Sequence, residues 1–177
     1  TSRGLGDVYK RQILYCGDKP MQKGILLSSM SLIGNVEEPL NIYILTVDYS
    51  EKGVNYNPVD KAFAKYLERK LNKSDIGVNV FLVDVTRYFV EELPEANMQS
   101  RFTACCMLRL FADKTDIKER VLYLDTDVLC RKDFSDFYYQ NMDGIEIAGV
   151  SDYYGRWLFG DGYILSLIHI SEPTRRR

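Results

Sequence analysis

One stretch of the sequence restricts the possible folds more than any other: four apolar residues that lead directly into two acids. Residues 121–124 (Val-Leu-Tyr-Leu) are rich in strand-forming types, and Asp125 and Asp127 follow them. A short apolar run of this kind is typical of a buried parallel strand. Side chains at i and i+2 of an extended segment point the same way, so the two carboxylates can converge. Paired carboxylates suit a hard divalent cation such as Mg²⁺ or Mn²⁺, commonly shared with a substrate phosphate.

Acids that follow a strand also have a purely structural interpretation. Aspartate is favoured in turns and at helix N-caps, so an isolated Asp-x-Asp is more often a pair of turn acids than a metal site. The pattern in the rest of the chain is what favours a site here.

Composition excludes several classes of protein. The chain has 177 residues, 46% of them hydrophobic and 27% charged, which is typical of one folded domain. No apolar run reaches the roughly 18–20 residues that cross a bilayer. The net charge of −2 provides no basic surface for nucleic acid. The cysteines show no Cys-x-x-Cys spacing, so neither a zinc site nor a disulfide framework is expected, and a reducing, cytoplasmic location is favoured.

Both ends of the chain look foreign to the rest. Residues 1–12 and 165–177 resemble translated sequencing-adapter read-through, so we expect a non-native leader and a non-native tail on a gene truncated at both ends. The single histidine, His169, lies in that tail and is therefore not used as a candidate ligand or base.

Apolar runs and helical periodicity alternate along the chain. Strands are expected at residues 13–17, 41–47, 78–83, 121–124 and 145–150, and helices at 21–33, 59–72, 88–92 and 101–113. This alternation predicts an α/β architecture with flanking helices and a mostly parallel sheet.

Each expected strand leads into an aspartate at its carboxyl end. The five are Asp18, Asp48, Asp84, Asp125 and Asp152. In open α/β sheets the ligand crevice lies at this edge, near the point where the strand order reverses. The alternative is that an aspartate only begins the next loop or helix, and for Asp48 and Asp84 that alternative is favoured.

A basic residue stands inside an apolar helical stretch. Arg109 lies between Leu108 and Leu110, and a guanidinium in such a place needs a carboxylate or phosphate partner. A salt bridge to Asp125 and a contact with substrate are both open. No glycine-rich phosphate loop of the usual types is present.

These stretches together resemble the family 8 glycosyltransferases, retaining enzymes of the GT-A fold that use nucleotide sugars. Three segments carry the likeness in the family's order: residues 13–18, residues 101–110 and the Asp-x-Asp strand at 121–128. Residues 149–152 (Gly-Val-Ser-Asp) are similar to the segment where the family places an acid near the donor sugar. The resemblance implies a Rossmann-like nucleotide-diphospho-sugar transferase fold in residues 13–164, incomplete at the C-terminus.

The resemblance also implies roles for particular residues. Asp125 and Asp127 are expected to hold Mn²⁺ or Mg²⁺, while Arg109 and Asp152 act at the donor sugar and its diphosphate. The residues expected to contact the UDP-sugar are Cys16, Gly17, Asp18, Thr103, Arg109, Asp125 and Thr126. The family's third metal ligand, a histidine well downstream, is missing from this chain.

The implied activity is a metal-dependent, retaining transfer of a hexose from a UDP-sugar to a glycan, lipid-linked or protein acceptor. Cell-surface polysaccharide or lipopolysaccharide synthesis fits such an enzyme. The resemblance also allows peripheral association with the inner face of the membrane through a C-terminal region that is missing here.

Two rival functions stay open. A phosphatase of the haloacid dehalogenase type uses an Asp-x-Asp after a strand as nucleophile and acid, although that motif normally follows the first strand of its domain. The second rival is a truncated fragment that binds the nucleotide without turnover.

Overall fold

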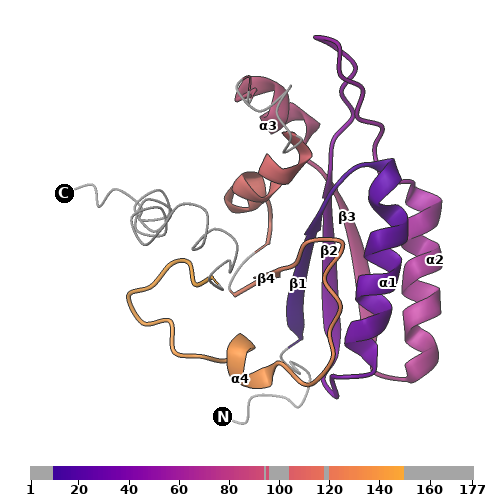
Figure 1. Ribbon diagram of the computed structural model, residues 1–177, viewed down its shortest axis with the longest axis vertical. Helices are drawn as coiled ribbons and strands as arrows, with labels where there is room; N and C mark the ends of the chain where they lie inside the picture. Colours follow the sequence, from indigo (N-terminus) through magenta and orange to yellow (C-terminus); the bar gives the residue numbers. More distant parts are fainter. Residues whose placement is uncertain (1–9, 94, 96–103, 118–119, 150–177) are drawn as a thin grey trace, which may run out of the picture. The chain divides into compact units, whose positions relative to one another are not determined.

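The computed structural model of the chain describes residues 10–93, 95, 104–117 and 120–149. The chain divides into two compact units, Thr1–Ser135 and Asp136–Arg177. The first unit contains the sheet and the residues that form the candidate site, and its architecture is drawn in Figure 1.

The sheet of the first unit has four parallel strands in the order β3-β2-β1-β4. The strands are β1 (Arg11–Cys16), β2 (Leu40–Thr46), β3 (Val78–Asp84) and β4 (Leu122–Tyr123). Ile13 of β1 is in register with Ile42 of β2 and with Leu122 of β4. The predicted α/β class and parallel sheet are therefore confirmed.

Helices and short 3₁₀ segments connect these strands. They are η1 (Lys19–Met21), α1 (Gln22–Ile33), α2 (Lys61–Leu71), η2 (Asn72–Ser74), α3 (Thr86–Glu91) and η4 (Ala104–Lys114), followed by α4 (Ser135–Tyr138). The helix predicted at residues 101–113 is thus a 3₁₀ helix over its described part. Its buried residues Cys105, Leu108 and Phe111 recur every three positions, which suits three residues per turn.

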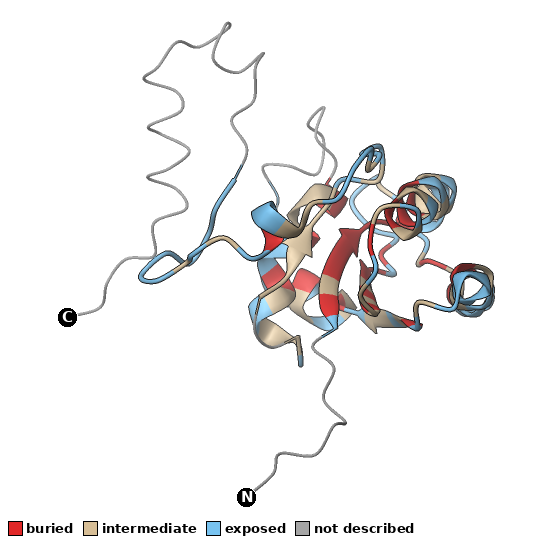
Figure 2. Cartoon of the chain, turned by 90° about the horizontal axis from the view of Figure 1, so that it is seen from below, coloured by how far each residue is buried: buried red, intermediate tan, exposed pale blue. Residues whose placement is uncertain are grey.

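Two apolar cores lie on opposite faces of the sheet because successive strand residues point to opposite sides. Ile13 and Tyr15 pack with α1 and α2, whereas Leu14 and Cys16 pack with α3 and η4. Figure 1 shows α1 and α2 together on one side of the strands. Figure 2 shows the buried residues concentrated in the strands and on the helix sides next to them. Since both faces are covered, residues 13–16 of β1 are all apolar.

The first strand begins earlier than predicted. Arg11 and Gln12 pair with Leu40 and Asn41 of β2, although both fall in the segment that we assigned to a leader. The Arg11 side chain is buried, and it donates hydrogen bonds to Glu38 at 2.9 Å and to the Ser135 hydroxyl at 2.6 Å.

The strand predicted at residues 145–150 is wrong for its described part. Residues 145–149 pair with no strand of the described chain, and Ile145 and Ile147 are 52% and 64% exposed. The segment instead leaves a turn in which Gly144 has φ +73° and the Ile145 N–H bonds to the Met142 carbonyl at 2.9 Å. Alternating apolar residues form a stable strand only where a neighbouring strand takes their backbone groups.

Among the helices that the structure describes, none combines the length and apolarity that a membrane crossing requires.

Candidate functional site at the strand-order reversal

The strand order places the candidate site between β1 and β4. The chain moves outward from β1 to β2 and β3 and then returns to the other side of β1 with β4. This reversal is the point at which open α/β sheets bind ligands, beyond the carboxyl ends of the strands. Asp18 follows β1 and Asp125 follows β4, so the sheet brings these two acids to the same edge.

Asp18 is a buried acid in the turn that leads into η1. The residue is 8% exposed, and burial raises the pKa of its carboxyl, while a bond to its own backbone N–H opposes that rise. Burial first and the nearby Asp18 charge second raise the pKa of the Cys105 thiol to about 12. Asp18 is therefore a shielded hydrogen-bond acceptor rather than a solvated surface acid.

Cys16 and Gly17 shape the same turn. Burial raises the pKa of the Cys16 thiol, against the opposing charge of Arg109, so Cys16 is an inert thiol and not a nucleophile. Any side chain at Gly17 would place its Cβ 2.9 Å from the Cβ and Cγ of Met21. Only glycine allows this close contact between the end of β1 and η1.

One further backbone hydrogen bond joins the chain to β1 between the end of β4 and the Asp-Thr-Asp turn. The Leu124 N–H donates to the Leu14 carbonyl at 3.0 Å, and the Val128 N–H then closes a turn onto the Asp125 carbonyl at 3.1 Å. Asp125 and Asp127 are exposed, whereas Thr126 is half-buried. The two carboxylates are thus accessible while the residue between them packs inward.

Helix α1 fixes the position of Thr126. A Cβ at Gly24 would lie 2.6 Å from the Thr126 carbonyl oxygen and 3.0 Å from its Cβ. The Thr126 hydroxyl also donates to the Met21 sulfur at 3.7 Å. The turn that carries Asp125 and Asp127 is therefore seated against the first turns of α1.

Tyr123, the last residue of β4, contacts both an acid and a cation. Its hydroxyl donates to Oδ1 of Asp125 at 2.5 Å, and the guanidinium carbon of Arg109 lies 4.8 Å from the centre of its ring. Burial, and then the bond to Asp125, raise the pKa of the Tyr123 hydroxyl. No ion pair joins Arg109 to Asp125 in the described chain, so the salt bridge considered from the sequence is not formed.

Asp125 and Asp127 fit a divalent cation as partial ligands. Both are exposed, and neither forms an ion pair with a described residue. Their oxygens are of the hard type that Mg²⁺ and Mn²⁺ prefer. Within the described ranges, however, no three His, Cys, Asp or Glu side chains cluster closely enough to form a complete cation site.

The remaining predicted site residues divide into two groups. Thr103 and Asp152 lie outside the described residues. Asp84 is confirmed as a turn acid, because its Oδ1 accepts the Thr86 backbone N–H at 2.9 Å and the Thr86 hydroxyl at 2.5 Å at the start of α3. Asp48 is exposed, and its backbone N–H donates to the Thr86 hydroxyl at 2.9 Å.

Sequence reasoning missed two residues that shape this site. Tyr123 stands two residues before Asp125. Side chains two residues apart in an extended segment point the same way, so this spacing was a signal that the two side chains share a direction. Gly24 interrupts a helical pattern, which often marks a close backbone approach.

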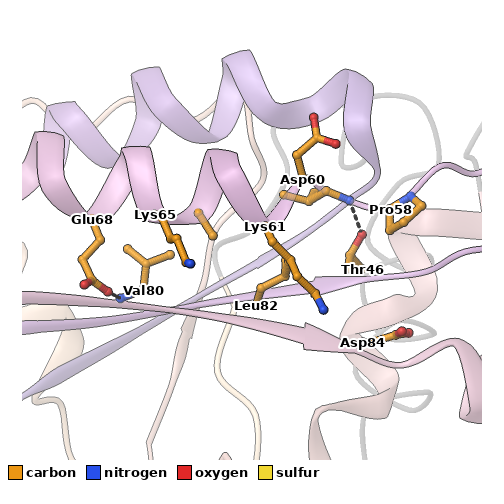
Figure 3. A pocket seen from close by; sticks show the side chains of 11 residues that line it. Thr46, Pro58, Asp60, Lys61, Lys65, Glu68, Val80, Leu82 and Asp84 are labelled. Atoms are coloured by element: carbon orange, nitrogen blue, oxygen red, sulfur yellow. Dashed lines mark hydrogen bonds between the residues drawn. The ribbon is translucent and has the colours of Figure 1, made fainter.

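A separate hollow of about 480 Å³ lies under α2, beside the edge strand β3 (Figure 3). Glu68 of α2 accepts the Val80 N–H at 2.8 Å, and Lys61 and Lys65 also line the hollow. β2 and β1 separate this hollow from β4 in the strand order.

Comparisons with known proteins identify the family of the chain and agree with its fold. The family described as "Glycosyl transferase family 8" matches residues 12–172. A crystal structure of the apo form of the glycosyltransferase GlyE from Streptococcus pneumoniae TIGR4 superposes with a TM-score of 0.54 at 19% identity, over 95% of this chain. This chain spans 40% of that protein. No curated protein matches the sequence. The extent of the family match shows that the chain belongs to glycosyltransferase family 8.

Proposed function

We propose that this chain is the N-terminal part of a metal-dependent, retaining glycosyltransferase that moves a hexose from a UDP-sugar to a glycan, lipid-linked or protein acceptor. The observation that carries the proposal is the meeting of Asp18, the Asp-Thr-Asp turn and Arg109 at the strand-order reversal. Family membership supports the transfer of a sugar, and the accessible carboxylates support the use of a cation.

Asp125 and Asp127 are the residues that would hold Mn²⁺ or Mg²⁺. Such a cation, when bound, neutralises charge that develops on a diphosphate leaving group. Arg109 supports the same task, because it forms no ion pair with a described carboxylate and its exposed guanidinium is available to an anion. Loss of one such contact raises a reaction barrier by on the order of 3 kcal/mol.

Asp18 is suited to the nucleotide base. A shielded carboxyl can accept hydrogen bonds from the ring N–H groups of a base, and the packing of Gly17 against Met21 fixes the turn that carries this carboxyl. Cys16, Thr103 and Thr126 complete the proposed contacts with the nucleotide sugar, and Asp152 is proposed to act near the donor sugar.

The acceptor hydroxyl is proposed to attack on the face from which UDP leaves, so that the anomeric configuration is retained. No covalent nucleophile is part of the proposal, and the buried thiols of Cys16 and Cys105, with their raised pKa values, are not suited to that role. A cytoplasmic site of action, with peripheral attachment to the inner membrane face through a further C-terminal region, is part of the same proposal.

The test is a calorimetric titration of UDP into the chain with and without Mn²⁺. We expect binding that tightens at least about tenfold with Mn²⁺, since a metal bridging protein and phosphate adds several kcal/mol of charge stabilisation. Asp125→Asn and Asp127→Asn should abolish the tightening while leaving the circular dichroism spectrum unchanged. Asp48→Asn is the matched control, because Asp48 follows β2 at the same edge of the sheet.

The rival functions give different results. Phosphate release from p-nitrophenyl phosphate would favour a haloacid-dehalogenase-type phosphatase. Metal-dependent UDP binding without hydrolysis of a UDP-sugar would identify a nucleotide-binding fragment. An equal loss of binding in Asp48→Asn and Asp125→Asn would contradict a specific Asp-x-Asp site.

A further inference from the structure

Tyr123 contacts residues of the proposed site, although the proposed function gives it no role. It ends a strand of two residues, and its backbone pairs with Leu14 at the centre of the sheet. Because β1 is held on its other side by β2 along six residue pairs, the base of the Tyr123 side chain is fixed. A side chain with a fixed base can set the positions of the groups that it contacts.

The hydroxyl of Tyr123 restrains one oxygen of Asp125. The 2.5 Å bond engages Oδ1 of a carboxylate whose residue is exposed. An exposed aspartate otherwise rotates freely between staggered conformers. Groups that hydrogen-bond to a metal-binding carboxylate fix its orientation in this way.

The ring of the same tyrosine lies against Arg109. The guanidinium carbon is 4.8 Å from the ring centre, within the range of a cation–π contact. No described carboxylate forms an ion pair with Arg109. A ring face holds a guanidinium in place without using its N–H donors, so those donors stay available to an anion.

These contacts give one side chain control over two opposite charges. Resting on the proposed function, we propose that Tyr123 is a positioning residue, which orients Asp125 through its hydroxyl and Arg109 through its ring. Asp125 would then hold the cation of a metal-bound diphosphate, and Arg109 would contact the diphosphate itself. The two roles separate chemically, because phenylalanine keeps the ring and loses the hydroxyl, whereas leucine loses both.

The first readout is UDP binding to the full chain, measured by calorimetry with and without Mn²⁺. Tyr123→Phe should reduce the Mn²⁺-dependent gain in affinity by about tenfold, which is typical for loss of a group that orients a metal ligand, and should leave metal-free UDP binding unchanged. Tyr123→Leu should weaken both. In an Asp125→Asn background, Tyr123→Phe should have no further effect.

The second readout needs no ligand. Side-chain ¹⁵Nε relaxation of Arg109 should report a restrained guanidinium in the wild-type chain and in Tyr123→Phe, and a mobile one in Tyr123→Leu. A role confined to folding would not separate the two variants in this way. Tyr49→Phe is the control, since the Tyr49 hydroxyl is buried and has no hydrogen-bond partner in the described structure.

The outcomes distinguish the two proposals. A wild-type chain that binds no UDP with Mn²⁺ overturns the proposed function and this inference with it. Metal-dependent binding in the wild type that is equally strong in Tyr123→Phe overturns only the inference about the hydroxyl. An Arg109 side chain equally restrained in Tyr123→Leu overturns the role of the ring.

Discussion

Asp84 ends β3 and Asp125 comes shortly after β4, at the same edge of the sheet, yet their carboxylates have different environments. Asp84 accepts two bonds from Thr86, two residues later, and so belongs to the turn that starts α3. Asp125 accepts a bond from Tyr123, two residues earlier on the strand itself. Both acids are exposed, but the carboxylate bonds of Asp84 hold the turn that starts α3, whereas the carboxylate bond of Asp125 runs to the side chain of Tyr123.

The neighbouring elements reinforce this difference. β3 is an edge strand of the described sheet, and β4 borders β1 at the reversal of strand order. The turn after β4 also depends on a close approach to α1 at Gly24, while the turn after β3 is held by the bonds of Asp84 to Thr86 and by backbone bonds to the end of β2. Substitutions at Gly24 and Asp18 should affect the region around Asp125 and leave the turn that starts α3 intact. A substitution at Asp84 should do the reverse.

The largest effect is expected from Gly24→Ala. The new Cβ would lie 2.6 Å from the Thr126 carbonyl oxygen, so the Asp-Thr-Asp turn or α1 must shift, at a cost of about 1–3 kcal/mol. Urea unfolding should show this loss of stability, and Mn²⁺-dependent UDP binding should weaken with it. Gly34→Ala is the control, because a Cβ there meets nothing within 4 Å, and should be neutral or slightly stabilising. Equal stabilities of the two variants would contradict the close packing.

A smaller effect is expected from Asp84→Ala. It leaves the Thr86 N–H without its acceptor at the start of α3, and loss of one such hydrogen bond costs about 1 kcal/mol. UDP binding with Mn²⁺ should not change. Asp125→Ala should show the reverse pattern, with stability preserved and metal-dependent binding lost. If Asp84→Ala lowered binding as much as Asp125→Ala, the contrast between the two acids would be wrong.

The smallest effect concerns Asp18→Asn. Burial raises the folded-state pKa of this carboxyl above its ordinary 3.8, so the folded chain holds its proton to higher pH than the unfolded chain and stability falls as the carboxyl ionises. Asparagine removes that cost. The melting temperature of Asp18→Asn should therefore exceed that of the wild type near pH 7, and the difference should disappear as the pH falls below 3.8. A difference in melting temperature that grows on acidification would contradict a raised pKa of the Asp18 carboxyl.

Much of the fold was predictable because the strands are short, mostly apolar runs separated by helical segments. Residues 13–16, 41–46 and 78–83 are such runs, as parallel strands next to helices require, and the structure pairs all three. The strand predicted at residues 145–150 failed in its described part because alternation alone does not supply a pairing partner. The reversal of strand order was expected from a general rule, but only the pairing of β4 with β1 placed Asp18 and Asp125 at one edge.

The candidate site was predictable as a set of residues but not as an arrangement. The Asp-x-Asp spacing and the aspartate after the first strand both indicated the correct edge. The bonds of Asp84 to Thr86 and of Tyr123 to Asp125 each join residues two apart, so local spacing indicated both. The contact of Arg109 with Tyr123 joins η4 to β4, and no local pattern specifies it.

The most direct test of this account is paramagnetic broadening of the chain's backbone amide signals by substoichiometric Mn²⁺ in the presence of UDP. Broadening falls steeply with distance from the ion, and β3 lies three strand spacings of about 4.8 Å each from β4. The account predicts the strongest broadening around Asp125, Thr126 and Asp127, followed by Gly17 and Asp18, and the weakest around Asp84 and Thr86. Strongest broadening at Asp84, or around Lys61 and Lys65 under α2, would contradict it.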